Sequence, residues 1–64
     1  MSDTTDTHKT SLLIVEDNDD FRNFLINCLK GTYQVFDAPN GKEALEILAH
    51  QSIQIVISDV MMPE

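Results

Sequence analysis

The sequence predicts an α/β fold with a doubly wound parallel sheet, and two observations carry this prediction. Apolar runs typical of strands alternate with segments of helical spacing, in the order strand, helix, strand, helix, strand. The first run contains only Leu, Ile and Val without interruption, as a strand buried on both faces of a parallel sheet requires, and the third run is rich in Ile and Val. Crossovers in such a fold are right-handed and leave successive strands parallel.

The first strand and the first helix follow from the apolar pattern. Residues 12–15, with the sequence LLIV, predict a strand that ends in acidic residues. Asn18 or Asp19 is expected to cap the helix that follows, Asp19 and Asp20 suit its positive end, and Gly31 is expected to end it. Apolar residues recur there with one helical stripe, which predicts five core side chains, the cysteine among them as a packed thiol: Phe21, Phe24, Leu25, Cys28 and Leu29.

The second half of the chain continues the same alternation. Residues 33–38 alternate in polarity and contain Tyr, Val and Phe, which predicts a second strand. Residues 39–41, Pro-Asn-Gly, are a turn signal, and Asn40 is expected to cap a helix over residues 42–50. A third strand is predicted over residues 53–58. The expected apolar stripe of the second helix comprises Ala44, Leu45, Leu48 and Ala49.

The composition excludes several classes of partner and location. Four Lys and Arg against eleven Asp and Glu give a net charge of −7, which disfavours nucleic acid and anionic membrane surfaces. The longest apolar run, residues 12–15, is far too short to cross a membrane. A single cysteine cannot form an internal disulfide, so we expect a cytoplasmic location. Residues 1–10 contain only one apolar residue and are expected to form a flexible polar tail.

Three acidic side chains are expected to converge at one edge of the predicted sheet. Glu16 and Asp17 follow the first strand, and Asp59 follows the third. The carboxyl ends of parallel strands lie at the same edge, where folds of this class bind their ligands. Three close carboxylates repel one another unless a cation lies among them. Because all the donors are hard oxygens, the sequence favours Mg²⁺ or Mn²⁺, with a phosphoryl group beside it.

Three strings of residues carry a resemblance to a known family. LLIVEDN, APNGKEAL and IVISDVMMPE stand in this order, and together they resemble the first half of a response-regulator receiver domain from two-component signalling. The resemblance implies a flavodoxin-like receiver fold, of which residues 11–64 supply only the N-terminal β-α-β-α-β half. It also implies that Asp59 is the phosphoacceptor. The implied Mg²⁺ ligands are Glu16, Asp17, Asp59 and the backbone carbonyl of Met61.

The resemblance implies a phosphoacceptor module and no stand-alone turnover enzyme. Such a domain phosphorylates itself, taking the phosphoryl group from the phosphohistidine of a sensor histidine kinase or a phosphotransfer domain. The string SDVMMPE is similar to receivers within hybrid sensor kinases, for which the location becomes the cytoplasmic portion of a membrane protein. Stand-alone regulators use nearly identical strings.

Two alternatives belong to other classes of function. A hydrolase with an aspartyl-phosphate intermediate usually has a second Asp two residues after the nucleophile, where this chain has Met61, which cannot transfer a proton. The other alternative is a protein-interaction module that is not phosphorylated, or an inactive truncated receiver, because the family's five strands outnumber the three predicted here. The third strand, residues 53–58, then forms an apolar edge that we expect a dimer partner or a swapped element to cover.

Overall fold

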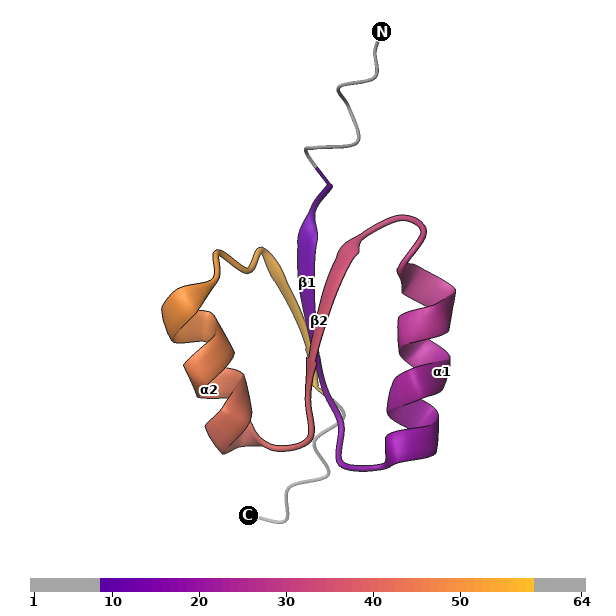
Figure 1. Cartoon of the computed structure of the whole chain (residues 1–64), viewed down its shortest axis with the longest axis horizontal. Coiled ribbons are helices and arrows are strands. Elements are labelled where there is room, and N and C mark those ends of the chain that lie inside the picture. The colour runs from indigo at the N-terminus through magenta and orange to yellow at the C-terminus, as the bar shows by residue number, and fades with distance from the viewer. Residues whose placement is uncertain (1–8, 59–64) are drawn as a thin grey trace, which may run out of the picture.

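The computed structural model describes residues 9–58, and five elements follow one another there in the predicted order (Figure 1). The predicted flexible tail over residues 1–10 lies mostly outside the described residues. No helix within residues 9–58 is long and apolar enough to cross a membrane. The elements are β1 (Ser11–Val15), α1 (Asp19–Leu29), β2 (Gln34–Ala38), α2 (Gly41–His50) and β3 (Ile55–Ser58).

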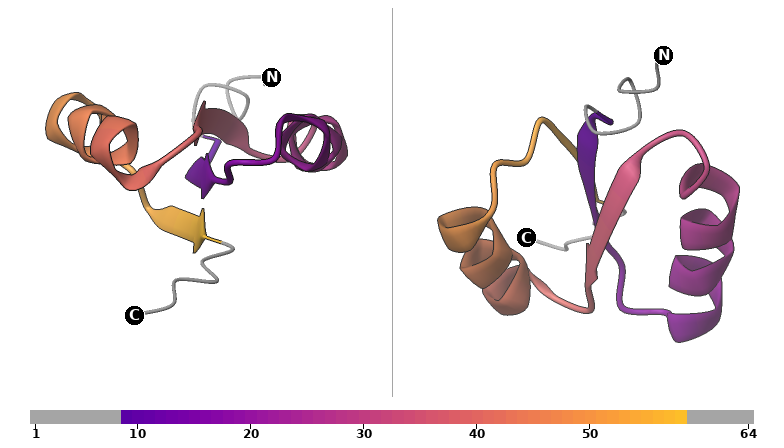
Figure 2. Two further views of the ribbon diagram at one scale, coloured as in Figure 1. Left: turned by 90° about the horizontal axis from the view of Figure 1, so that it is seen from below. Right: turned by 45° about the horizontal axis from the view of Figure 1, so that its top comes forward.

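The three strands form one parallel sheet in the order β2-β1-β3, which confirms the predicted doubly wound arrangement. After β1 the chain forms β2 along one edge of β1. It then passes over β1 and forms β3 along the opposite edge. Two right-handed crossovers in opposite directions place their helices on opposite faces of the sheet. Figure 2 shows this arrangement, with α1 and α2 on either side of the strands.

The central strand β1 is the core of the described sheet. Leu12, Leu13 and Ile14 are almost completely buried, as the uninterrupted apolar run predicts for a strand covered on both faces. Successive side chains of a strand point to opposite faces. Leu13 therefore packs on the α2 side, where it forms a buried cluster with Ala38 of β2 and Ala44 of α2. Leu12 and Ile14 face the side that α1 covers.

An asparagine side chain caps each helix, as predicted for Asn40. Of the two predicted candidates for the first helix, Asn18 and Asp19, Asn18 is the cap. The Asn18 side chain accepts a hydrogen bond from the backbone N–H of Phe21 at 2.8 Å, which caps α1. The Asn40 side chain accepts one from the backbone N–H of Glu43 at 2.9 Å, which caps α2. These caps fix where each helix leaves the sheet edge at which the strands end.

The predicted apolar stripe of α1 is partly wrong. Phe21 and Phe24 are 42% and 59% exposed, and Cys28 is exposed rather than packed. The two phenylalanine rings stack on each other, with their centroids 6.2 Å apart. Among the described residues α1 contacts only β1 and β2. The surface of the helix that these strands cover is therefore narrower than the surface occupied by its apolar side chains. The covered surface contains Arg22, Leu25, Ile26 and Leu29, all of them half-buried.

The predicted stripe of α2 is wrong in the same way. Ala44 is buried, and Ile47 packs against the core cluster. Leu45 is 68% exposed and Leu48 is 40% exposed, although both were predicted to be covered. Periodicity identifies the apolar residues of a helix, but the neighbouring elements decide which of them are buried.

Strand β3 is the least covered element of the described sheet. Within residues 9–58 it pairs only with β1, and neither helix contacts it. Its apolar side chains are accordingly exposed on both faces: Ile55 38%, Val56 50% and Ile57 37%. The predicted apolar edge is therefore present. Long apolar edges of this kind are templates for pairing with another segment.

Replacing a leucine of the core strand should destabilise the protein far more than replacing an exposed leucine. Leu13→Ala removes a completely buried side chain and is expected to lower the free energy of unfolding by about 2–5 kcal/mol. Leu45→Ala is the matched control because that side chain is 68% exposed, and its expected effect is within about 0.5 kcal/mol. Urea unfolding measures both; equal losses would contradict the assignment of β1 as the core.

Candidate functional site

The three strands end together at one edge of the sheet, which is the lower edge in Figure 1. Val15, the last residue of β1, is paired with Ala38 at the end of β2 and with Ser58 at the end of β3. Adjacent strands lie about 4.8 Å apart. In a sheet of this order the winding reverses between β1 and β3, and such folds bind ligands just beyond the strand ends at that point.

Glu16 is the first residue beyond β1 at this edge. Its side chain is buried, which is unusual for a carboxylate, and one hydrogen bond fixes its position. Its exposed fraction is only 6%. Its backbone N–H donates a hydrogen bond to the carbonyl of Ala38 at 3.0 Å, which extends the β1–β2 ladder by one residue. Its carboxylate oxygen Oε2 accepts a hydrogen bond from the backbone N–H of Asn18, also at 3.0 Å.

The second carboxylate oxygen of Glu16 has no hydrogen-bond partner among the described residues. Oε1 is also buried, so it lacks the hydration that normally stabilises a carboxylate oxygen. A buried acceptor without a partner costs about 1–3 kcal/mol, and more when it is charged. A cation, or a water molecule bound to one, would remove this cost. The donor chemistry of Glu16 therefore fits the predicted metal site.

Asp17 lies next to Glu16 in the turn before α1, and its side chain is exposed. The part of the chain from residue 9 to residue 58 contains no group of three or more acidic, histidine or cysteine side chains arranged to hold a metal. The other predicted members of the site, Asp59 and the carbonyl of Met61, lie outside the described residues. The described residues thus contribute one buried and one exposed carboxylate.

Arg22 is a residue of this edge that the sequence did not reveal as functional. Its side chain is only 14% exposed and reaches three segments of the chain. Nη1 donates to the backbone carbonyl of Glu16 at 2.8 Å, and Nε donates to Oδ2 of Asp37 in β2 at 3.0 Å. Nη2 donates to Oδ1 of Asp19 at 2.7 Å. These bonds connect the turn after β1 to both α1 and β2.

The carboxylates around Arg22 perturb its ionisation. The hydrogen bond that Arg22 donates to Asp19 is the largest influence and raises the pKa of Arg22 above its ordinary value; partial burial opposes it, and Asp37 adds to the increase. Arg22 therefore carries its full positive charge at any physiological pH. One sequence signal could have identified it, because a cation in the first turn of a helix opposes the helix dipole and requires specific partners. Its partner Asp37, fifteen residues away, had no such signal.

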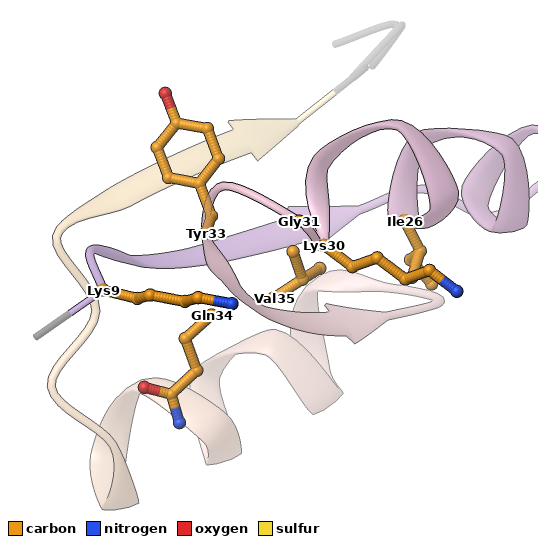
Figure 3. A pocket seen from close by; sticks show the side chains of 7 residues that line it. All are labelled: Lys9, Ile26, Lys30, Gly31, Tyr33, Gln34 and Val35. Atoms are coloured by element: carbon orange, nitrogen blue, oxygen red, sulfur yellow. The ribbon is translucent and has the colours of Figure 1, made fainter. Parts of the chain in front are cut away.

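A hollow at the opposite end of the sheet does not form a second site. It lies where α1 ends and β2 begins, and Lys9 and Lys30 contribute to its walls. Figure 3 shows that the polar ends of Lys30, Tyr33 and Gln34 point in different directions, so they do not surround a common point. The buried carboxylate oxygen without a partner, Oε1 of Glu16, lies instead at the edge beyond the strand ends.

Comparison with known proteins identifies one family and several relatives. The sequence profile of the response regulator receiver domain matches residues 12–64. The sensor histidine kinase TmoS of Ectopseudomonas mendocina is 48% identical over 52 residues, which are 81% of this chain and 5% of that protein. Histidine kinase P4 of Formosa agariphila is 43% identical over 60 residues, or 94% of this chain and 4% of that protein. The response regulator receiver protein CpdR of Brucella abortus is 37% identical over 54 residues, 83% of this chain and 45% of that protein.

The relatives are much longer than the matched segment. This chain spans only 5% and 4% of the two kinases and less than half of the receiver protein. No solved structure matches the chain.

Removing the cap of α1 should destabilise the protein without changing its charge. Asn18→Ala deletes the acceptor for the Phe21 N–H and is expected to lower the free energy of unfolding by about 1 kcal/mol. Asn27→Ala is the matched control, because Asn27 is exposed within the same helix, where alanine is favoured by about 0.5 kcal/mol. Thermal unfolding followed by circular dichroism compares them. A loss in the Asn27 variant as large as in the Asn18 variant would contradict the capping role.

Proposed function

We propose that this chain, which belongs to the response-regulator receiver domains, accepts a phosphoryl group on Asp59. The donor is the phosphohistidine of a sensor histidine kinase or of a phosphotransfer domain. One observation carries the proposal furthest: the buried Glu16 carboxylate keeps an unpartnered oxygen at the edge where β1 and β3 end. Asp59 is bonded directly to Ser58, whose partner in β1 is the residue before Glu16.

We propose that Mg²⁺, or Mn²⁺ in its place, is the cofactor of this site. The residues that would hold it are Glu16, Asp17 and Asp59 through their carboxylates and Met61 through its backbone carbonyl. The cation would supply positive charge that offsets the charge of the phosphoryl oxygens. The unpartnered Oε1 of Glu16 and the exposed carboxylate of Asp17 support this ligand set, since hard oxygen donors favour these ions.

In the proposed transfer, a carboxylate oxygen of Asp59 attacks the phosphorus of the donor. A bond between that oxygen and phosphorus forms as the bond between phosphorus and the histidine nitrogen breaks, and the nitrogen keeps the electron pair. A carboxylate, unlike a hydroxyl group, has no proton to lose before it attacks, so it requires no base to activate it. Positioning and charge stabilisation supply the catalysis. Met61 stands where a hydrolase would place its acid–base aspartate, so we propose no stand-alone turnover.

The relatives suggest the setting in which the transfer takes place. Two of them are described as histidine kinases and one as a receiver protein, so we propose either a hybrid kinase or a separate regulator, acting in the cytoplasm. The exposed apolar side chains of β3 support a further proposal, that a second chain or a swapped element covers this strand. An interaction module without phosphorylation is not favoured, because the acidic residues at 16, 17 and 59 are all present.

Phosphorylation by a small donor tests the proposed function directly. The full-length protein is incubated with acetyl phosphate and Mg²⁺, and its intact mass is measured. We expect a gain of one phosphoryl group, which hydroxylamine removes because the product is an acyl phosphate. Asp59→Asn should abolish the gain. Asp20→Asn is the matched control, because it removes an exposed acid at the start of α1 and should leave the gain unchanged.

Two results would contradict the proposal. A wild-type protein that gains no phosphoryl group with Mg²⁺ present would show that the site does not accept one from this donor class. An Asp59→Asn variant that gains it as readily as the wild type would show that another residue is the acceptor.

A further inference from the structure

We propose that Arg22 is a positioning residue, which holds the turn over residues 16–18 so that Glu16 and Asp17 present their carboxylates at the sheet edge. The inference has two parts. The first, that Arg22 fixes the turn, concerns the protein without a metal. The second, that the fixed turn is needed for cation binding, rests on the proposed function.

The contacts of Arg22 make it the connection between three segments at the site. Its guanidinium bonds to the carbonyl of Glu16, which lies between the two acidic side chains in the backbone. Its other donors bond to Asp19 in α1 and to Asp37 in β2. Hydrogen bonds between charged groups are stronger than neutral ones, and the planar guanidinium fixes the direction of each. The turn is thereby attached both to the helix that follows it and to the neighbouring strand.

The arrangement also directs the hydrogen-bond donors of Arg22 to groups other than the carboxylates that would bind a cation. Arg22 contacts Glu16 through the backbone oxygen and not through the side chain, and its ion pairs are with Asp19 and Asp37. Oε1 of Glu16 consequently stays without a partner although a guanidinium lies nearby. Removing either ion-pair partner would leave a charge free to compete with a cation for Glu16.

A positioning role and a simple charge effect predict opposite changes in cation affinity. If Arg22 acted only through its charge, Arg22→Gln would remove a repulsive charge and tighten Mg²⁺ binding, while Arg22→Lys would leave it unchanged. If Arg22 positions the turn, both variants should weaken binding, because neither side chain can bond to three segments at once. Residues that orient metal ligands typically change affinity by about 10-fold or more when they are replaced.

The experiment measures Mg²⁺ binding to the full-length protein by titration calorimetry. We expect about a 10-fold higher dissociation constant for both Arg22→Gln and Arg22→Lys. Lys30→Gln is the matched control, because it removes the same charge from the C-cap of the same helix, far from the turn. Its dissociation constant should equal that of the wild type or fall slightly.

A second measurement, made without any metal, tests the positioning itself. Hydrogen exchange of the Asn18 amide, which donates to Oε2 of Glu16, reports whether the turn is held. Both Arg22 variants should exchange this amide about 10-fold faster, since a lost hydrogen bond to a charged group corresponds to at least that factor. The Leu13 amide in the core strand is the internal reference. Its rate should stay near that of the wild type, which shows that the variants are folded.

The outcomes separate the inference from the proposed function. If the wild type binds Mg²⁺ and the Arg22→Lys variant binds it equally well, the second part of the inference is wrong while the metal site stands. If Asn18 exchanges at the wild-type rate in both Arg22 variants, the first part is wrong whatever the metal does. A wild type that binds no Mg²⁺ overturns the metal site and the second part together, and the exchange rates still decide the first.

Discussion

Repulsion among carboxylates at the edge where the strands end is the constraint on which the rest of this structure depends. Glu16, Asp17, Asp19 and Asp37 lie within a few residues of that edge, and the chain as a whole carries a net charge of −7. Close like charges raise the free energy of the folded state unless cations neutralise them. Arg22 offsets part of this repulsion because it forms ion pairs with Asp19 and Asp37. Neither Glu16 nor Asp17 forms an ion pair with Arg22, and we propose that a cation neutralises them.

The sheet fixes where this repulsion occurs. The side chains of Leu12, Leu13 and Ile14 are buried on both faces of β1, and this burial locks its register against β2 and β3. A shift of one residue would turn the buried leucines outward, so the register is strongly specified. Because Val15 is paired with both Ala38 and Ser58, the three strands end at one place, and the acids Glu16, Asp17 and Asp37 lie near it. Hydrophobic burial thereby holds these charged groups near one another, although their repulsion would otherwise separate them.

The sequence predicted the features that arise from local patterns. The five elements, their order, the parallel sheet and the Asn40 cap follow from apolar runs and capping residues, and the structure confirms them. For the first helix the sequence left two candidate caps, Asn18 and Asp19, and the structure has Asn18. It did not predict which helical side chains are covered, because that depends on neighbouring elements. Phe24 and Leu45 belong to apolar stripes and still face solvent. An apolar residue of a helix contributes to the same periodicity in the sequence whether another element covers it or solvent does.

At the candidate site, the sequence located the acidic pair after β1 but did not indicate the contacts around that pair. The acidic pair after β1 was expected, and the burial of Glu16 with an unpartnered oxygen supports that expectation. The network of Arg22 was not found, since its bond to Asp37 joins residues fifteen positions apart, which no local pattern connects. The assignments of Asp59 and Met61 are predictions from the resemblance alone. The parts of a site that depend on contacts distant in sequence require the folded chain.

Paramagnetic broadening by Mn²⁺ can locate the proposed divalent-cation site at the edge beyond β1 and β3. Substoichiometric Mn²⁺ is added to the isotopically labelled full-length protein, and the loss of each amide signal is recorded. We predict that the signals of Glu16, Asp17 and Ser58 broaden first, and that those of Gly31 and Gln34 at the opposite end of the sheet stay sharp. Excess Mg²⁺ should restore the lost signals. Broadening centred on Gly31 and Gln34, or uniform across the protein, would contradict the account.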